Sequence, residues 1–459
     1  MKNEKLKEYL MAQGVEYLAD KIISISTYDR LLSKELEFII LKSDPKKLAK
    51  KLNQQINGIA KHKTFVTWDK ELEFIQELEQ IIEIIEKDLM PNDLTLAIEL
   101  IEKLFAIDQT ITEIVDGSNG CVGMFYQDLA ELWGKACMLI DKTNLSLLPK
   151  KIYDLLINNH YGTRDKIIEN SAKALGKEGL RALEQIIKDN ESQFFKYSLY
   201  SIYTDIADGL DDVDKYIAII KQYGSLNEST VCSVAKRLIT KWRGEEAIDW
   251  LMHQPEDIGL DLSLPKPECK IMLSKRYDLL LEAFELESMV KEAEKLRWAL
   301  FEKTLSKTYY DSLLKHQPSE IAEKIKARAF NFAKNYGGSI NTILQFLNEI
   351  QEYSEIEEII LEKYQELNGE NYSFYRPLSK TLATAGHPLA ACLLRRKLID
   401  NILARALAKY YKYAISDLKL AGDFSNNVKN WFEHLTHTQY LEKLKKDHPR
   451  KQAFWSNLN

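Results

Sequence analysis

The stretch ELEFIQELEQIIEIIEKDL, from Glu71 to Leu89, contains the pattern that decides the fold. Apolar residues recur in it at intervals of three and four, and Glu, Gln or Lys fills most of the remaining positions. This spacing places the apolar side chains on one face of an α-helix and the charged side chains on the opposite face. The apolar positions that form this stripe are Phe74, Ile75, Leu78, Ile81, Ile82, Ile85 and Leu89.

The same helical period recurs through the rest of the chain. Sustained alternation of apolar and polar residues, which would indicate strands, does not occur. Glycine (18) and proline (10) are scarce among 459 residues, which argues against an all-β fold because tight turns between short strands depend on both. The period predicts further helices at Leu94–Ile114, Ser146–Asn158, Ile321–Phe332 and Ile340–Ile350.

Residues that favour helix ends support this interpretation. Asp44 followed by Pro45 is typical of a helix N-terminus, because the carboxylate caps it and proline fits the first turn. Asp211 is expected to cap a helix at Val213–Tyr223, and Gly386 to close another helix.

After Gly386, His387-Pro388 is expected to open the next helix. The pattern there predicts one unusually long helix from Pro388 to about Leu420, followed by helices at Phe424–Leu435 and Gln439–Lys446.

Helices of 10–20 residues are marginally stable alone in water, so each must bury its apolar face on neighbours. We therefore predict an all-α fold, an irregular α-solenoid of stacked antiparallel helical hairpins similar to TPR or HEAT arrays. A short internal echo between the segments around Ala247 and Ala293 supports stacking, because its spacing falls in the range of helical-repeat units. Separate compact bundles are the alternative.

Breaks in the helical pattern indicate three regions. We expect an N-terminal helical region at 1–115, a helical-hairpin array at 116–385 and a C-terminal basic helical segment at 386–459. The array contains a break at 254–269, where Pro255, Pro265 and Pro267 interrupt the pattern.

Composition bears on the compartment and on partners. The net charge of −6, from 63 basic and 69 acidic residues, gives no overall attraction to nucleic acid or to an anionic membrane. The five cysteines are scattered without CxxC spacing, which favours a reducing, cytoplasmic setting. The N-terminus lacks the uninterrupted apolar core of a secretory signal, and no stretch is apolar enough to span a bilayer. We therefore expect no membrane association.

Three motifs resemble known sites, but each lacks a required residue. The glycine-rich stretch 116–123 has no lysine where a Walker phosphate loop needs one, and the acidic cluster from Asp205 to Asp214 lacks the spacing of an EF-hand. His434 and His437 are three apart, with Glu433 outside them, whereas HExxH zinc sites need a separation of four. We expect no catalytic residues, no cofactor and no metal site.

The C-terminal segment has the most distinctive charge distribution. From His387 to Lys451 it contains thirteen Lys and Arg residues but six Asp and Glu residues, interleaved with tyrosine and tryptophan. This pattern fits either a nucleic-acid-binding patch or a solvated helix face above a packed aromatic core. The candidate interaction residues are His387, Arg395, Arg396, Asp400, Arg405, Lys409 and Tyr410.

The last aromatic residues lie at the end of this segment. Phe454 and Trp455 would expose a large apolar surface if they stayed in solvent. We therefore expect both side chains to pack back onto the preceding helices.

Four stretches resemble a bacterial family of helical proteins of unknown function. Related C-terminal regions of that family accompany SWIM-type zinc fingers, which implies a link to nucleic acid, but the cysteine and histidine ligands of such a finger are absent here. The resemblance covers most of the chain and implies no reaction. The matching stretches are Ile206–Ala218, Leu296–Ser306, His387–Asp400 and His448–Trp455.

Three functional hypotheses follow. The first is an interaction scaffold that binds a protein or peptide on a helical-repeat surface. The second is a nucleic-acid-associated protein that uses the basic C-terminal segment. The third is an enzyme with a site assembled from His387, Arg396, Asp400 and Tyr410, in which Arg396 and Asp400 pair one helical turn apart.

Overall fold

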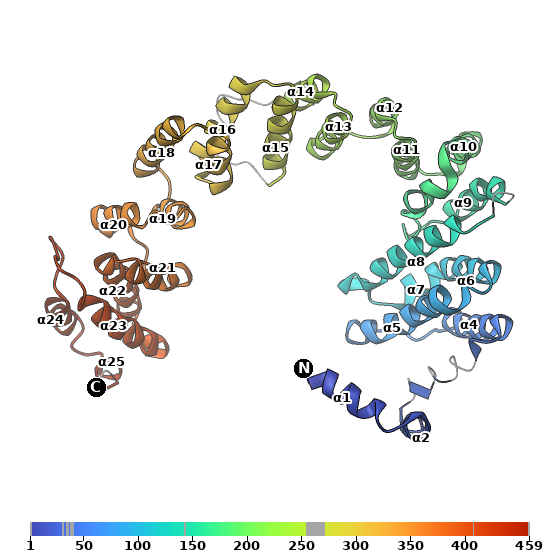
Figure 1. Cartoon of the computed structure of the whole chain (residues 1–459), viewed down its shortest axis with the longest axis horizontal. Coiled ribbons are helices and arrows are strands. Elements are labelled where there is room, and N and C mark those ends of the chain that lie inside the picture. The colour runs from blue at the N-terminus through green and yellow to red at the C-terminus, as the bar shows by residue number, and fades with distance from the viewer. Residues whose placement is uncertain are drawn as a thin grey trace. The chain divides into compact units, whose positions relative to one another are not determined.

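The computed structural model describes residues 2–29, 32–33, 36, 41–141, 144–253, 271–406 and 408–457. Every regular element in these ranges is a helix, which confirms the all-α prediction. One isolated β-bridge joins Val66 to Val115. The chain divides into two compact units, unit 1 (Met1–Leu238) and unit 2 (Ile239–Asn459), each drawn in Figure 1. The expected break at 254–269 lies outside the described residues.

Unit 1 begins with two helices that bury little and continues with a closely packed series (Figure 1). Its elements are α1 (Lys2–Met11), α2 (Val15–Ser26), α4 (Pro45–Ala60), α5 (Trp68–Ile84), η1 (Ile85–Leu89), α6 (Leu94–Ala106), α7 (Asp108–Ile114), η2 (Gly117–Asn119), α8 (Cys121–Met138), η3 (Leu145–Leu147), α9 (Leu148–Leu156), α10 (Ile167–Asp189), η4 (Glu191–Gln193), α11 (Lys196–Leu210), α12 (Val213–Tyr223) and α13 (Glu228–Thr240).

In unit 2, α22 contacts both α21 and α23 (Figure 1). The elements of the unit are α14 (Gly244–His253), α15 (Ile271–Leu286), α16 (Val290–Thr304), α17 (Lys307–Leu314), α18 (Ser319–Lys334), α19 (Ile340–Glu349), α20 (Tyr353–Glu362), η6 (Tyr364–Glu366), α21 (Tyr372–Thr384), α22 (Pro388–Ala404), η7 (Ala408–Tyr410), α23 (Tyr411–Ser425), α24 (His437–Asp447) and α25 (Gln452–Trp455).

Helix α8 lies at the centre of unit 1, where it contacts α5, α6 and α10. Trp133 is fully buried there and donates a hydrogen bond from Nε1 to Ser171 Oγ of α10 (3.1 Å). A Cβ atom on Gly134 would come within 2.6 Å of the Asn170 carbonyl oxygen, so glycine is needed at this position for α8 and α10 to approach.

The helix predicted at Glu71–Leu89 is confirmed with one local change. Its last turn, η1, is a π-helix in which Met90 N donates to the carbonyl oxygen of Ile85 (2.8 Å). The segment predicted at Leu94–Ile114 forms two helices, because the chain breaks at Ile107. The break accompanies a buried ion pair between Asp108 and Arg164 (3.1 Å). An aspartate on the exposed face of a continuous helix could not form this buried pair.

The expected helix cap at Asp211 is wrong by one residue. Asp211 has a positive φ of 61° and ends α11, whereas Asp212 caps α12 by accepting a hydrogen bond from Lys215 N (2.9 Å). Two adjacent aspartates therefore have two roles, since aspartate suits both a left-handed turn and an N-cap.

The single long helix predicted from Pro388 to Leu420 is also wrong. Helix α22 ends at Ala404, Ala406 has a left-handed φ of 55°, and α23 begins at Tyr411. Nothing in the local residue pattern signals this break. The packing of α23 against α22 in the folded chain outweighs the helix propensity of the connecting residues.

The helix predicted at Phe424–Leu435 is not formed beyond Ser425, and residues 426–436 connect α23 to α24 without a regular helix. Asn430 accepts a hydrogen bond from Phe432 N through its side-chain oxygen (2.9 Å). Such side-chain hydrogen bonds compete with the backbone hydrogen bonds of a helix. The spacing of apolar residues therefore predicted a helix that does not form.

Phe454 and Trp455 pack inward, as expected. Phe454 is fully buried against Tyr411 and belongs to the same apolar cluster as Leu418 and Leu444. Trp455 is half-buried and donates from Nε1 to the His448 carbonyl oxygen (2.9 Å). The C-terminal residues therefore complete the core of unit 2.

None of the described helices combines the length and apolar character that crossing a bilayer requires. Among the described cysteines, Cys121, Cys137, Cys232 and Cys392 form no disulfide.

We predict that replacing Phe454 with alanine lowers the free energy of unfolding of unit 2 by about 3–5 kcal/mol, because the substitution leaves a cavity in a closed cluster. Urea denaturation followed by circular dichroism measures this loss. Phe432→Ala is the matched control, since that side chain is 68% exposed in the same unit. Equal stability of the two variants would contradict the packing.

Candidate functional site

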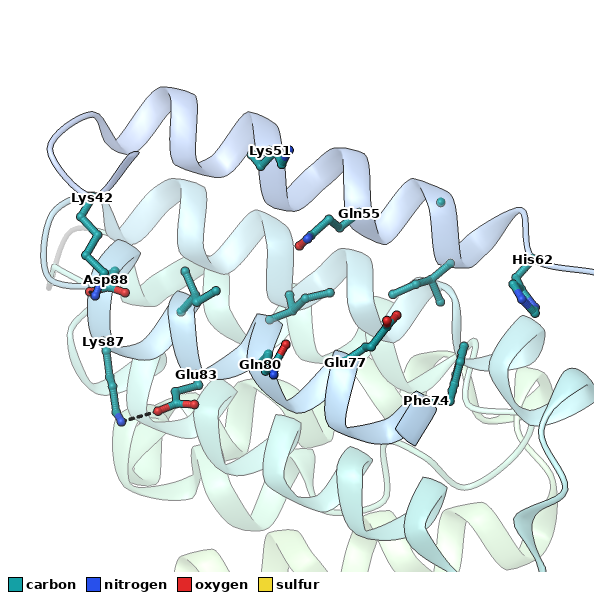
Figure 2. A pocket seen from close by; sticks show the side chains of 14 residues that line it. Lys42, Lys51, Gln55, His62, Phe74, Glu77, Gln80, Glu83, Lys87 and Asp88 are labelled. Atoms are coloured by element: carbon teal, nitrogen blue, oxygen red, sulfur yellow. Dashed lines mark hydrogen bonds and ion pairs between the residues drawn. The ribbon is translucent and has the colours of Figure 1, made fainter. Parts of the chain in front are cut away.

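In unit 1, a groove with a volume of about 710 Å³ runs between α4 and α5 (Figure 2). Each helix turns its buried stripe toward the core and presents the adjacent face to the groove. The lining positions on α5 and η1 include 74, 77, 81, 84 and 88, an interval of three and four that keeps them on one face. The lining residues are Lys42, Lys51, Gln55, Gly58, Ile59, His62, Phe74, Glu77, Gln80, Ile81, Glu83, Ile84, Lys87 and Asp88.

The middle of the groove is apolar, with two amide groups. Ile59, Ile81 and Ile84 supply the apolar side chains. Figure 2 shows Gln55 on α4 and Gln80 on α5, on opposite sides of the groove. The Gln55 side-chain oxygen is buried without a hydrogen-bond partner among the described residues.

The two ends of the groove differ in chemistry. At one end, Lys42 pairs with Asp88 (3.0 Å) and Lys87 pairs with Glu83 (2.5 Å). At the other end, the rings of His62 and Phe74 lie 6.0 Å apart. The groove can thus hold an elongated apolar group between a charged end and an aromatic end.

In unit 2, Arg395 is 2% exposed and all of its nitrogen atoms are hydrogen-bonded. Nε donates to Ser379 Oγ (2.7 Å), Nη1 to the Asp417 carboxylate and Nη2 to the Arg376 carbonyl oxygen (2.8 Å). Arg376 also binds Asp417 (2.8 Å), so one buried carboxylate holds two arginines. Arg395 is therefore a structural residue that connects α21, α22 and α23.

Arg396 is equally buried, but its contacts are different. Nη1 donates to the Leu435 carbonyl oxygen (2.6 Å), and the guanidinium carbon lies 4.7 Å from the Trp431 ring centroid and 4.6 Å from that of Tyr440. Nε and Nη2 are buried with no hydrogen-bond partner among the described residues. Each unpaired buried N–H group costs about 1–3 kcal/mol, so two on one charged group are unusual in a native interior.

The predicted i, i+4 pair between Arg396 and Asp400 is not formed. Asp400 instead accepts a hydrogen bond from the Tyr440 hydroxyl (2.7 Å). Burial raises the pKa of Asp400, although this hydrogen bond opposes the rise. Burial also raises the pKa of the Tyr440 hydroxyl.

The remaining candidates lie elsewhere in unit 2. His387 Nδ1 is 2.8 Å from Glu357 Oε2, and Arg405 pairs on the surface with Glu370 (3.0 Å). Lys409 lies over the Tyr410 ring at 4.9 Å, and both side chains are exposed. The structure therefore brings Arg396 and Asp400 together around Tyr440, while His387 and Tyr410 have other partners.

An exposed surface on α21, η7 and α23 combines aromatic rings with basic groups. The Tyr410 and Tyr413 rings are 6.3 Å apart, and Lys412 lies 5.0 Å from the Tyr413 ring. Arg376 lies between Tyr372 and Tyr413, at 5.6 and 5.2 Å from their rings. We call it the tyrosine–lysine surface, consisting of Tyr372, Arg376, Lys409, Tyr410, Lys412 and Tyr413.

The other motifs have local structural roles. In the glycine-rich stretch, Gly120 takes a φ of 77°, and Asn119 Nδ2 donates to the Trp68 carbonyl oxygen (3.2 Å), which ties the turn to α5. His434 packs edge-on against Tyr364, with ring centroids 5.4 Å apart, and His437 is the first residue of α24. Burial and the nearby Arg396 charge lower the pKa of both histidines.

The acidic cluster is split between the surface and the interior. Asp208 forms a bidentate pair with Arg237, with both N–O distances 2.6 Å. Asp205 is half-buried and has neither hydrogen bond nor ion pair within the described ranges. Burial, reinforced by the nearby Glu169, raises the pKa of Asp205 to about 7.

Sequence reasoning missed the groove and the partners of the buried arginines. The sequence gives no signal for the groove, since Gln80 lies among the polar residues Gln76, Glu77 and Glu83 on its helix face. No sequence signal identifies Asp417 as the partner of Arg376 and Arg395, because those three residues lie on three different helices.

The described chain is therefore an all-helical protein with a groove in one unit and a buried arginine cluster in the other. A family model described as "Family of unknown function (DUF6880)" matches residues 2–203 and 196–457, and the chain belongs to this family. This match bears out the expected membership in a family of unknown function. No curated protein matches the chain.

We predict that Arg395→Met lowers the free energy of unfolding by about 3 kcal/mol, because Asp417 would lose one of its two buried cationic partners. Chemical denaturation measures the effect. Arg405→Met, on the exposed end of the same helix, should change stability little. Similar small losses for both variants would show that Arg395 is not structural.

We also predict a pH effect at Asp205. The folded pKa of about 7 exceeds the ordinary value of 3.8, so the folded protein retains a proton that the unfolded chain loses. The resulting stability is fully present below pH 3.8 and is lost as the pH rises to about 7, by at most about 1.4 kcal/mol per pH unit.

Asp205→Asn removes this dependence. The stability of the variant relative to wild type should increase from pH 4 to pH 7 and then level off, as measured by urea denaturation at each pH. A stability difference that stays constant over this range would refute the raised pKa.

Proposed function

We propose that the chain is an interaction scaffold that binds a helical segment of a partner protein in the groove between α4 and α5. The observation that carries the proposal is the groove itself, whose volume of about 710 Å³ falls in the range of ligand-binding clefts. From Phe74 to Asp88 the groove follows the helix axis for about 21 Å, the length of roughly 14 helical residues.

The lining favours an amphipathic helix. Such a helix would place apolar residues at i, i+3 or i+4 and i+7 against Ile59, Ile81 and Ile84. Polar side chains beside that stripe would meet the amides of Gln55 and Gln80. The charge pairs at one end, Lys42–Asp88 and Lys87–Glu83, would favour a partner segment with charged residues of both signs.

The solenoid interpretation is part of this proposal. Consecutive helices contact one another in several pairs, such as α10 with α11, α11 with α12, and α16 with α17. This order supports stacked antiparallel hairpins of the TPR or HEAT kind, which present extended surfaces to partners. The described cysteines form no disulfide, which is in keeping with a cytoplasmic location.

The tyrosine–lysine surface supports a second candidate function, association with nucleic acid. Exposed tyrosines can stack on bases, and the neighbouring lysines can contact phosphates. The association of related C-terminal regions with SWIM-type zinc fingers would agree with this function. Arg395 and Arg396 would not contribute, since both are buried.

We predict that a photo-crosslinking residue at Gln80 captures one discrete polypeptide in the native cells, because Gln80 faces the groove. Gln76 is the matched control, since it is exposed on the same helix but does not line the groove. Gel electrophoresis and mass spectrometry of the products, with and without nuclease, distinguish a protein partner from a nucleic acid.

Ile84→Asp should reduce capture at Gln80 by roughly 10- to 100-fold, because it places a charge on the apolar floor. Leu72→Asp, on the exposed part of α5, should leave capture unchanged. Identical products at Gln80 and Gln76 would refute the groove. A product lost on nuclease treatment would support the nucleic-acid function instead.

A further inference from the structure

Arg395 and Arg396 are adjacent on α22 and both are 2% exposed, but their side chains have different hydrogen-bond partners. Each nitrogen of Arg395 has a partner, and the Asp417 carboxylate balances its charge. Arg396 has one hydrogen bond, from Nη1 to the Leu435 carbonyl oxygen. No carboxylate among the described residues is hydrogen-bonded to Arg396.

The unpaired nitrogens of Arg396, Nε and Nη2, form one edge of the guanidinium group. Their two N–H groups are nearly parallel and match the spacing of two oxygen atoms in a carboxylate or a phosphate. The rings of Trp431 and Tyr440, both within 4.7 Å of the guanidinium carbon, restrict its orientation. The edge is therefore held in place before any ligand binds.

The groups around this edge are short of negative charge. Asp400 is engaged by the Tyr440 hydroxyl (2.7 Å), while Cys392 and Tyr364 are the other titratable groups near Arg396. His434 and His437 are close enough for the Arg396 charge to act on them, and this charge and burial lower the pKa of both, which favours their neutral forms. His437 Nδ1 is a second buried nitrogen without a hydrogen-bond partner in the described part of the chain.

We propose that the Nε–Nη2 edge of Arg396, with the nearby buried Nδ1 of His437, binds a small oxyanion, namely a carboxylate or phosphate group. The anion would accept the two parallel N–H groups and supply the charge that Asp417 supplies to Arg395. This site is separate from the groove between α4 and α5 and does not depend on the function proposed for that groove.

The segment that covers Arg396 can open to admit an anion from solvent. Trp431 and Leu435, which contact Arg396, belong to the connection 426–436 between α23 and α24, where no regular helix forms. Phe432 in the same connection is 68% exposed, with a left-handed φ of 46°. A short connection with few backbone hydrogen bonds can open locally at lower cost than a packed helix.

The test measures the melting temperature of the full chain in sodium phosphate, sodium sulfate, sodium acetate and sodium chloride at equal ionic strength. A ligand that binds only the folded state raises the melting temperature with the logarithm of its concentration. We expect phosphate or acetate at millimolar concentration to raise it above the chloride value. The acetate and phosphate series show which of the two groups the site prefers.

Arg396→Lys keeps the charge but loses the two-pronged edge, so its apparent affinity for the anion should fall at least tenfold. Arg405→Lys makes the same change on the exposed end of α22 and should retain the wild-type response. A wild-type response no larger than in chloride overturns the proposal, as does an unchanged response in Arg396→Lys.

A second measurement serves if Arg396→Lys does not fold. Equilibrium dialysis with radiolabelled phosphate or acetate counts the anions that each chain binds. We expect the wild type to bind one labelled anion that unlabelled anion displaces, and His437→Ala to bind it with lower affinity. No binding to the wild type, or unchanged binding to His437→Ala, then overturns the proposal.

Discussion

The Asp417 carboxylate lies at 1% exposure on α23, and it receives hydrogen bonds from Arg376 on α21 and Arg395 on α22. A carboxylate at such depth is tolerated only when cationic donors surround it, so the three helices must sit where all three side chains meet. Most of what is distinctive in unit 2 depends on this arrangement. It fixes α22 between its neighbours, leaves Arg396 on the adjacent face, and brings Arg376 beside the exposed tyrosines.

The sequence predicted helices well where one apolar stripe determined their packing. The Glu71–Leu89 stripe and the Asp44–Pro45 start are examples, because amphipathic spacing and N-capping are local properties. Predictions failed where tertiary packing or a side-chain hydrogen bond to the backbone decided the outcome. The break after Ala404 depends on how α23 packs, and the loss of helix after Ser425 accompanies a hydrogen bond from the backbone to the Asn430 side chain. Neither cause changes the spacing of apolar residues.

The candidate site was harder to predict for a related reason. Counting basic residues from His387 to Lys451 treats each charge as exposed, whereas Arg395 and Arg396 are buried and only residues such as Arg405 and Lys409 face solvent. Adjacent helix positions point about 100° apart, so two neighbouring arginines can meet entirely different partners. The groove in unit 1 was missed because it arises from the shapes of two packed helices rather than from any motif in either one.

The π-helical turn η1 at the charged end of the groove has a consequence for insertions and deletions in this chain. A π-turn accommodates one residue more than an α-turn over the same rise, so the residues after it are offset by one position from the α-helical register. Lys87 and Asp88 lie within this turn, and Asp88 meets Lys42 from there. Deletion of a single residue between Ile85 and Leu89 would restore an ordinary α-helical turn with one position fewer, so one side chain at this end of the groove would be lost. The length of this one turn, as much as the identity of its residues, therefore sets the chemistry at that end of the groove.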